Sequence, residues 1–329
     1  MDTKDLYIII VTYNNRWNFI TRSLEKLNQF NPNVNIVIVN NGSHSPDDYF
    51  LNAFKFQSQI ILNAESNLGS AAAFKKGILH VTNISNDCLI LLLDDDNIVD
   101  QNSVVLLISA WNNKVSDFDV DTFAVMGLRT QRKYLMNTAN GFLVASQFPQ
   151  NNEFLGFGKR LIYNRFIKRK DIIKSEFIKI PCAPYGGFLF HIALISQIGL
   201  PDERFYVYAD DFEFTYRITK NGGSIFLIPD AKIEDIEESW QVKPSKSVFK
   251  PKFLFPQNPL IYLSVRNFVY FQSKNLVTSR FVFTINRFLY SFFLLVIAIF
   301  TGQLNEFNRF SRAVSDGLKG KFDNNYYIK

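Results

Sequence analysis

Three consecutive aspartates, Asp94, Asp95 and Asp96, follow the apolar run from Cys88 to Leu93. An apolar run of this length is typical of a strand buried on both faces in the middle of a sheet. Carboxylates crowded at the end of such a strand repel one another and lose hydration unless a cation or a ligand lies beside them. Ligands of open α/β sheets bind beyond the carboxyl ends of the strands, so the triplet predicts a divalent metal that holds a phosphate-bearing ligand. A helix N-cap would explain one of the aspartates but not three.

A second acidic cluster, Asp210, Asp211 and Glu213, lies among aromatic residues. At helical spacing Asp210 and Glu213 share a face, and Asp211 faces elsewhere. Glu213 also stands four residues before Arg217, the spacing of an ion pair that supports a helix. Adjacent carboxylates raise one another's pKa, which suits a general base. The cluster therefore predicts a base beside at least one structural ion pair.

The first 125 residues alternate apolar runs with amphipathic stretches, which is typical of βαβ units and a parallel sheet. Strands are expected at 7–11, 35–39, 59–62 and 88–93, with helices at 17–30 and after Gly69. Small residues follow Gly69, and small residues at a helix start let the backbone approach an anion closely.

Residues 126–180 are less regular and include a basic stretch from Lys159 to Lys170. A solvated helix face is the favoured interpretation of this stretch, and contact with an anionic substrate is the alternative. A turn rich in proline and glycine, 181–187, precedes an apolar segment, 188–198, that we expect to be a helix.

The bulk composition fits a globular protein, with 47% hydrophobic residues and 34 phenylalanines. The first apolar run is short and follows acidic residues, so we expect no signal peptide and a cytoplasmic start. Cys88 and Cys182 have no metal-ligand spacing and are expected to be buried thiols in a reducing compartment.

The C-terminal part is basic, because residues 243–329 hold 13 lysines and arginines against 3 acidic residues. A basic region on a slightly acidic body indicates a polyanionic partner, either a membrane or a nucleic acid. Its most hydrophobic segment runs from Arg280 to Gly302, but the uncharged part begins only at Phe288 and is shorter than the ~20 residues of a membrane span. A membrane-surface helix is favoured over a buried helix and a true span.

Seven ordered motifs together resemble the large inverting glycosyltransferase family two, which has the GT-A fold. The motifs are Ile10–Asn14, Val39–Ser43, Asn67–Gly69, Asp94–Asp96, Gly186–Gly187, Asp210–Glu213 and Arg266–Asn267. The triplet and the Asp-Asp-Phe-Glu-Phe block are most similar to bacterial galactofuranosyl- and rhamnosyl-transferases. The resemblance implies an α/β fold, Rossmann-like, with a mostly parallel sheet, flanking helices and an α-helical C-terminal appendage.

The resemblance also implies roles for single residues. Asp211, or second Asp210, would be the catalytic base. The nucleotide-sugar would contact Thr12, Tyr13, Asn14, Asn40, Asn67, Gly69, Asp94 and Asp95. Mn²⁺ or Mg²⁺ would be bound by Asp94, Asp96 and Asp235, and the acceptor by Tyr185, Gly186, Gly187 and Glu213.

Two positions depart from the family pattern. Asn40 stands where the family usually has aspartate, which removes a charge near the base or ribose. Asp235 stands where the family often has a metal-binding histidine, six residues after Pro229. Carboxylate is a good ligand for a hard metal, so the site either survives with an extra negative charge or is rearranged.

The implied function is transfer of a sugar, galactofuranose or rhamnose being favoured, from a UDP or dTDP donor to a polyprenyl-diphosphate-linked glycan. Such enzymes build O-antigen, capsule or other surface polysaccharide at the cytoplasmic face of the inner membrane. The catalytic domain would span 1–244, with a nucleotide-sugar half to about 125 and an acceptor half beyond it, and the basic, Phe-rich helical region 245–329. An inactive nucleotide-sugar-binding protein is the alternative. A nucleic-acid-binding module ranks last, because the basic residues are interleaved with an apolar run.

Overall fold

The computed structural model describes residues 2, 5–44, 46, 50–159, 175–237, 251–256 and 260–323 of the chain. It forms two compact units. The first consists of Met1–Asn140, Ile173–Tyr206 and Asp210–Glu237, and the second of Gly141–Ile172, Val207–Ala209 and Glu238–Lys329. The predicted domain boundary at 244 lies outside the described residues, as does the predicted basic stretch beyond Lys159.

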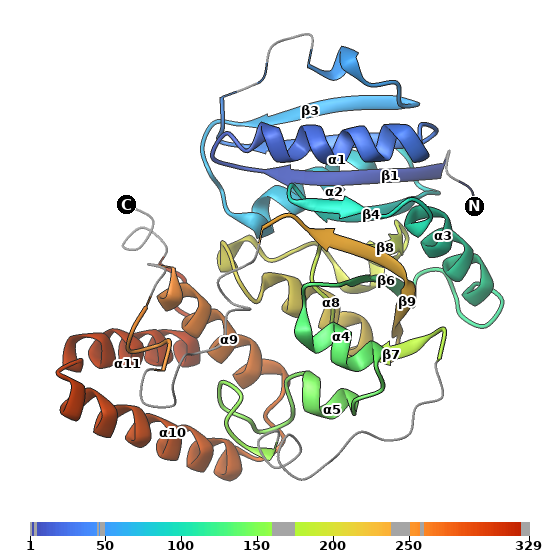
Figure 1. Cartoon of the computed structure of the whole chain (residues 1–329). Coiled ribbons are helices and arrows are strands. Elements are labelled where there is room, and N and C mark those ends of the chain that lie inside the picture. The colour runs from blue at the N-terminus through green and yellow to red at the C-terminus, as the bar shows by residue number, and fades with distance from the viewer. Residues whose placement is uncertain are drawn as a thin grey trace. The chain divides into compact units, whose positions relative to one another are not determined.

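A mixed sheet organises the first unit, with strands in the order β3-β2-β1-β4-β8-β6-β9-β5 and β7 also paired with β9 (Figure 1). The strands are β1 (Leu6–Thr12), β2 (Asn35–Asn41), β3 (Ser58–Ala64), β4 (Leu89–Asp94), β5 (Asn97–Val99), β6 (Phe123–Arg129), β7 (Ile178–Ile180), β8 (Phe188–His191) and β9 (Ser224–Asp235). Strands β1, β2, β3, β4, β6 and β9 run in one direction, so their carboxyl ends meet at one edge. The predicted α/β class with a mostly parallel sheet is confirmed.

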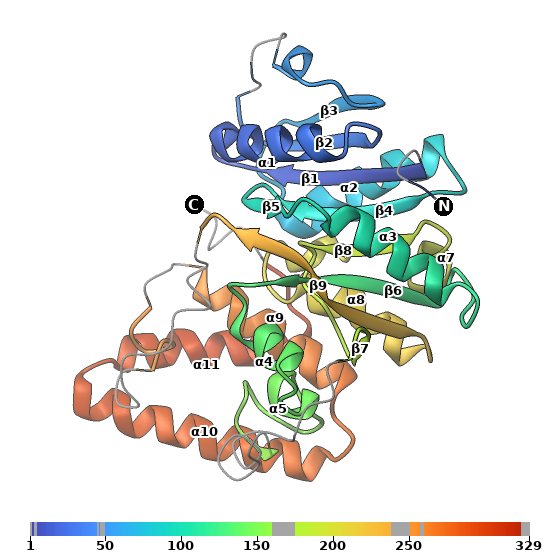
Figure 2. The same cartoon turned by 45° about the vertical axis from the view of Figure 1, so that its right-hand side comes forward.

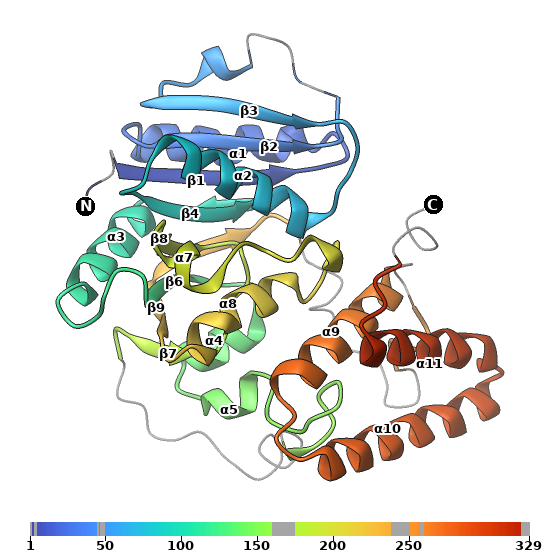
Figure 3. The same cartoon turned by 180° about the vertical axis from the view of Figure 1, so that it is seen from behind.

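Helices cover both faces of this sheet (Figures 2 and 3). On one face α1 (Trp17–Phe30) and α3 (Ser103–Lys114) share a core with Ile8 and Ile10 of β1. On the other face lies α2 (Ser70–Ile84), where a Cβ on Gly77 would come within 2.5 Å of Ile9. Alternate residues of β1 thus face opposite helical layers, as strand geometry requires. Helices α4 (Lys133–Ala139), α7 (Leu194–Ile198) and α8 (Asp210–Lys220) complete the described helices of this unit, with the short turns η2 (Leu51–Ala53) and η3 (Glu203–Phe205).

The segment 188–198 was predicted as one apolar helix, and that prediction is wrong. Residues 188–191 form strand β8, which pairs antiparallel with both β4 and β6, and only Leu194–Ile198 is helical. Phe188, Leu189 and Phe190 are all fully buried. A short apolar run has the same hydrophobic pattern in a central strand as in a buried helix, so periodicity alone did not separate them.

The second unit is helical, which confirms the predicted C-terminal helices. It contains α5 (Val144–Gln147), α9 (Ile261–Asn275), α10 (Arg280–Thr301) and α11 (Leu304–Lys319). Helices α9 and α11 pack closely at Gly317, where a Cβ would lie 2.5 Å from the carbonyl oxygen of Arg266. Arg266 itself is fully buried and donates to Asn267, whose amide donates to the carbonyls of Val207 and Tyr208. This motif therefore organises the interior of the second unit.

Candidate active site

The carboxyl ends of β1, β4, β6 and β9 bring charged side chains together at one edge of the sheet. Asp94 ends β4, Arg129 ends β6 and Asp235 ends β9. The sequence placed the three aspartates of the triplet here, and the parallel pairing of β6 with β9 adds Arg129 and Asp235.

Asp95 points into the protein and is held by two donors. The Thr12 hydroxyl donates to its carboxylate over 3.0 Å, and Arg16 Nε donates over 2.9 Å. Burial raises the pKa of Asp95 to about 6, although Arg16 and Thr12 oppose the shift. Arg16 also pairs with Glu237 over 2.6 Å and lies over the rings of Tyr13 and Phe19. Asp95 and Thr12 were both predicted to contact the nucleotide. In the structure they contact each other, and Asp95 also pairs with Arg16.

Arg129 joins Asp94 to Asp235. Its Nη1 donates to Asp94 Oδ2 over 2.7 Å and its Nε to Asp235 Oδ1 over 2.8 Å. Arg132 Nε donates to the other oxygen of Asp235 over 3.1 Å. The side chains of Arg129 and Asp235 are each only 2% exposed. Asp235 was predicted to be a third metal ligand, which stays a prediction, but both of its oxygens already accept from arginines.

Asn97 and Gly186 close the packing around this ion-pair cluster. Asn97 accepts from the backbone N–H of Asp94 over 3.0 Å and donates to Asp235 over 3.0 Å. A Cβ on Gly186 would lie 2.1 Å from Asn97 Oδ1, 2.6 Å from Arg129 Nη1 and 2.9 Å from Asp94 Oδ2. Gly186, predicted to contact the acceptor, is therefore required for the close approach of these side chains.

Asp96 is the carboxylate of the triplet with the weakest contacts. Its nearest cation is Arg16 Nη2 at 3.9 Å, and Asn97 donates to it over 3.4 Å. Burial, followed by the charge of Asp94, raises its pKa to about 7. Asp94 is more accessible, with a side chain 36% exposed.

The donor set suits a metal that is shared with a substrate. Among the described residues, no group of three histidine, cysteine, aspartate or glutamate side chains is arranged to hold a metal. Mg²⁺ and similar hard cations are usually bound by one or two carboxylates plus the phosphates of a substrate. Asp94 and Asp96 can supply those two carboxylates, so this part of the site fits the implied metal.

Asp210 is anchored to the start of α2. The Ser70 hydroxyl donates to Asp210 Oδ2 over 2.7 Å. Burial and the adjacent Asp211 raise the pKa of Asp210 to about 8, and Ser70 opposes part of the shift. At neutral pH Asp210 is therefore mostly protonated.

Asp211 has a lower pKa than its neighbour. Burial raises it to about 6, while the N–H of Phe212 and the charges of Arg132 and Arg129 oppose the shift. The charge of Asp94 raises the pKa of both Asp210 and Asp211. The two acidic clusters found in the sequence therefore share one electrostatic environment.

The turn before α8 has an unusual backbone. Tyr206, Tyr208 and Ala209 have φ values of 63°, 70° and 61°, in a region that costs a non-glycine residue of order 1–3 kcal/mol. Such strain is typical of functional sites. Gly69 has a φ of 83°, and a Cβ there would lie 2.2 Å from the carbonyl oxygen of Tyr206. The predicted nucleotide contact Gly69 thus also packs against the turn that leads to the acids.

The other predicted nucleotide contacts are divided between framework and surface. Asn40 is 1% exposed and donates to Asn63 over 2.8 Å and to Ser43 O over 3.0 Å. A carboxylate cannot donate, which gives a physical reason for asparagine at this position. Asn67 accepts from Asn41 and from Gly69, and so shapes its own loop. Of the predicted nucleotide contacts, Tyr13 and Asn14 follow β1, are exposed and can meet a ligand.

The predicted acceptor residues are mostly buried. Tyr185 is 4% exposed, and its ring packs 4.3 Å from that of Phe74, so it presents no open face to a sugar. Its hydroxyl is buried and has no hydrogen-bond partner in the described part of the chain. Glu213 forms the expected ion pair with Arg217, which confirms a structural role. Gly187 has a φ of 93° and packs against Ile233.

Sequence reasoning missed Arg16, Arg129, Arg132 and Asn97. The available signal was position, because Arg129 ends the buried strand β6, Arg132 follows shortly after it, and Arg16 follows the buried strand β1. A buried cation at the carboxyl end of a strand is as costly as a buried carboxylate. Positive and negative side chains at the same edge therefore indicate a network of ion pairs.

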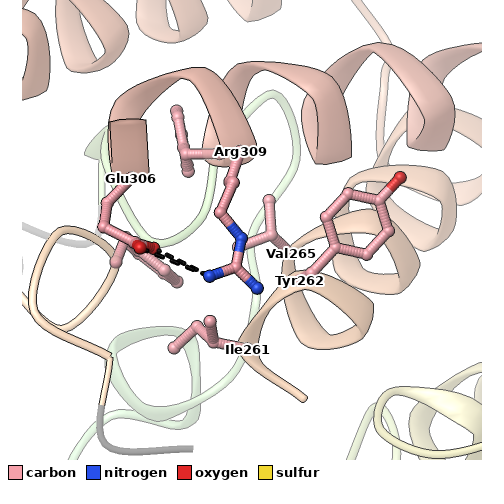
Figure 4. Close-up of a pocket in the computed structure, with 7 residues that line it drawn as sticks. Ile261, Tyr262, Val265, Glu306 and Arg309 are labelled. Atoms are coloured by element: carbon pink, nitrogen blue, oxygen red, sulfur yellow. Dashed lines mark hydrogen bonds and ion pairs between the residues drawn. The ribbon is translucent and has the colours of Figure 1, made fainter. Parts of the chain in front are cut away.

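A separate hollow lies in the second unit, between α9 and α11 (Figure 4). Ile261, Tyr262 and Val265 line it, and Arg309 extends across it to an ion pair with Glu306. It contains none of the predicted site residues, so we assign it no catalytic role.

The fold and the site define a class of protein: a GT-A-like α/β protein with an acidic edge where the strands end. The family model described as glycosyl transferase family 2 matches residues 7–199. The chain belongs to this family, which confirms the family-level resemblance found in the sequence. The narrower likeness to galactofuranosyl- or rhamnosyl-transferases stays a prediction.

Several solved structures are similar to this chain at low sequence identity. GalNAc-T7, in a structure with UDP, GalNAc and Mn²⁺, is 16% identical with a TM-score of 0.52, over 81% of this chain and 48% of its own. The mannosyltransferase PcManGT from Pyrobaculum calidifontis, with GDP-Man and Mn²⁺, is 12% identical with a TM-score of 0.49, over 96% and 75%. S. aureus TarS 1–349 with UDP-GlcNAc is 14% identical with a TM-score of 0.49, over 96% and 83%. This chain spans about half the length of the first of these, and no curated protein matches it.

Replacement of Gly186 by alanine tests the packing of the cluster. We expect Gly186→Ala to lower the free energy of unfolding by about 1–3 kcal/mol, because the new methyl overlaps Asn97 and Arg129. Chemical denaturation measures the change. Gly127→Ala is the control, since its Cβ first meets the flexible end of Ile233. An equal loss of unfolding free energy in both variants would contradict the role assigned to Gly186 in the packing of the ion-pair cluster.

Replacement of Asp210 tests its raised pKa. A carboxyl that holds its proton more tightly in the folded state stabilises the fold at low pH and loses that contribution as pH rises through about 8. Asparagine does not ionise, so Asp210→Asn should gain in melting temperature over wild type between pH 5 and pH 9. Asp230→Asn, at an exposed position, is the control. A constant difference across this range would show that the pKa is not raised.

Proposed function

We propose that this protein is an inverting, metal-dependent glycosyltransferase that uses a nucleoside-diphosphate sugar. The observation that carries the proposal is geometric: in a chain of glycosyl transferase family 2, carboxylates converge where parallel strands end, and Ser70 holds Asp210 at the start of α2. It supports a single site with donor-binding carboxylates on one side and a base on the other.

Asp211 is the proposed base. The acceptor hydroxyl oxygen attacks the anomeric carbon and forms a new C–O bond, while the bond to the diphosphate breaks and its electron pair leaves with the phosphate oxygen. The proton of the hydroxyl passes to Asp211. A pKa of about 6 leaves Asp211 ionised at neutral pH and still basic enough to accept it, whereas Asp210 at about 8 is mostly protonated.

On the donor side, Asp94 and Asp96 are the proposed ligands of Mn²⁺ or Mg²⁺. The bound metal would neutralise charge on the departing diphosphate as a Lewis acid. Tyr13 and Asn14 are exposed after β1 and are placed to meet the nucleotide. Asn40, Asn67 and Gly69 would shape the loops around it.

The finer substrate assignment rests on the sequence resemblance. It favours UDP or dTDP as the nucleotide, galactofuranose or rhamnose as the sugar, and a polyprenyl-diphosphate-linked glycan as the acceptor. The process would be synthesis of O-antigen, capsule or another surface polysaccharide.

Substitution of the base gives the first test. With a panel of UDP-, dTDP- and GDP-sugars, Asp211→Asn should lose about 10²–10⁴-fold in kcat while nucleotide binding is kept. The wild-type rate should fall about tenfold per pH unit below about pH 6, because a protonated Asp211 accepts no proton. Asp210→Asn is the matched control and should lose less. Nucleotide binding without turnover of any donor would instead favour an inactive sugar-nucleotide-binding protein.

We further propose that α10 rests on an anionic membrane surface at the cytoplasmic face of the inner membrane. Of the described helices, α10 is the one long and apolar enough to cross a membrane, although that feature alone is weak support. Its inner side is buried at Phe283, Leu294, Ile297 and Ala298. Its outer side remains exposed and apolar, at Phe281, Val282, Ile285, Phe288, Leu289, Phe292, Phe293, Ile299 and Phe300.

Charge favours an anionic lipid surface as the occupant of this outer side. Helix α10 has two arginines, Arg280 and Arg287, and no acidic residue. Helix α11 adds Arg309, Arg312 and Lys319 against Glu306 and Asp316, so the two helices together keep an excess of positive charge. Phenylalanines on one side of a helix with arginines nearby are typical of interfacial helices, and an apolar side this large is unusual on a soluble monomer.

Vesicle binding tests this surface. Phe288→Glu/Phe292→Glu should abolish co-sedimentation with vesicles containing phosphatidylglycerol, because two exposed phenyl rings that would enter the lipid are replaced by charges that the lipid repels. Leu79→Glu, at an exposed apolar position on α2, is the control and should bind as wild type. Wild-type binding that ignores lipid charge and salt would contradict the proposal. So would a dimer in solution that the double substitution dissociates, since a second copy would then cover this side.

A further inference from the structure

We propose that Asp235 is the counter-ion of Arg129 and Arg132 rather than a metal ligand, and that Arg129, held in this way, positions Asp94 for the donor. The inference rests on the proposed function for the donor, but its first part concerns contacts that exist without any ligand.

The contacts of Asp235 use both of its oxygens. Oδ1 accepts from Arg129 Nε over 2.8 Å and from Asn97 over 3.0 Å, and Oδ2 accepts from Arg132 Nε over 3.1 Å. The two donors on Oδ1 occupy both of its lone pairs, so the remaining lone pair of Asp235 is on Oδ2, beside the Arg132 guanidinium. A divalent cation placed there would be repelled by that guanidinium, and a hard cation has the phosphates of the donor available instead.

Arg129 has no alternative counter-ion of equal burial. Its other partner, Asp94, is 36% exposed and is reached only by Nη1. Nη2 lies 2.7 Å from Asp235 Oδ1, but its N–H is poorly aligned and makes no hydrogen bond within the described part of the chain. Arg129 is therefore fixed by Asp235 on its buried side and offers one donor to Asp94.

This arrangement determines how Asp94 is presented. One of its oxygens, Oδ2, is bound by Arg129, and its backbone N–H donates to Asn97. Oδ1 accepts no hydrogen bond from a described residue and is left for the donor. Arg129 thus fixes Oδ2 and Asn97 fixes the backbone of Asp94, so these two contacts together determine which oxygen of Asp94 is free.

Four variants test the inference with two measurements, melting temperature and the affinity for Mn²⁺ in the presence of UDP measured by electron paramagnetic resonance. Asp235→Asn should lower the melting temperature strongly, because it leaves Arg129 buried without its charge partner. Arg129→Met/Asp235→Leu should recover most of that loss, because the pair is removed together. Arg129→Met alone should also be less stable than the double variant, but less affected than Asp235→Asn, because Asp235 keeps Arg132 and Asn97.

The affinities then separate the roles. Loss of an outer-sphere partner typically lowers metal affinity about 10–100-fold. Asp96→Asn, the reference for a true ligand, should lower the Mn²⁺ affinity by at least this factor. Asp235→Asn should lose less than Asp96→Asn. The stable double variant should still bind Mn²⁺ and UDP more weakly than wild type, since Asp94 is no longer positioned, and a purely structural pair would not show this loss.

Three outcomes would overturn the inference. Asp235→Asn could keep its melting temperature and lose Mn²⁺ affinity as fully as Asp96→Asn, which would make Asp235 a ligand. The double variant could be no more stable than the single ones, which would refute the counter-ion role, or it could bind as wild type, which would refute the positioning role. Failure of the wild type to bind either Mn²⁺ or UDP would count against the proposed function, while the melting temperatures would still decide the ion pair.

Discussion

The balance of charge at the carboxyl edge of the sheet is the constraint on which the site depends. Asp94, Asp95 and Asp235 converge there, and each is offset by a fixed arginine within 2.9 Å. Without these cations the carboxylates would repel one another in a region that water scarcely reaches. The arginines allow strand β4 to end in acids, and only Asp96 is left without a close cation. The network therefore stabilises the fold at this edge. It also leaves Asp96 as the carboxylate that no arginine neutralises at close range.

Much of the fold could be predicted from the sequence because buried parallel strands have a distinctive pattern. The run before Asp94 is apolar at every position, which a strand covered on both faces requires, and β1 and β2 repeat it. The prediction failed at 188–198, where a strand enters the sheet antiparallel. Its pairing partners, β4 and β6, are distant in the chain, and no local property of Phe188 or Phe190 encodes them.

The site shows the same division. Residue type and position after a strand were enough to find the acids. Burial of several carboxylates together is costly, so such a cluster indicates a candidate functional site. What each acid contacts was not accessible, since Arg129 reaches Asp235 across 106 positions in the chain. Tyr185 shows the same limit. The resemblance implied an acceptor contact for it, but burial could not be inferred from the sequence, and its ring packs on Phe74.

The junction between Ser70 and Asp210 has a consequence for how this protein can change over time. Gly69, which precedes α2, packs against Tyr206, Ser70 donates to Asp210, and Asn41 accepts from Leu68. A mutation that reshapes the loop before α2 will therefore also shift Asp210. Under the proposed function, donor and acceptor preferences would be mechanically linked, and new specificities at this edge would arise through paired substitutions rather than one at a time.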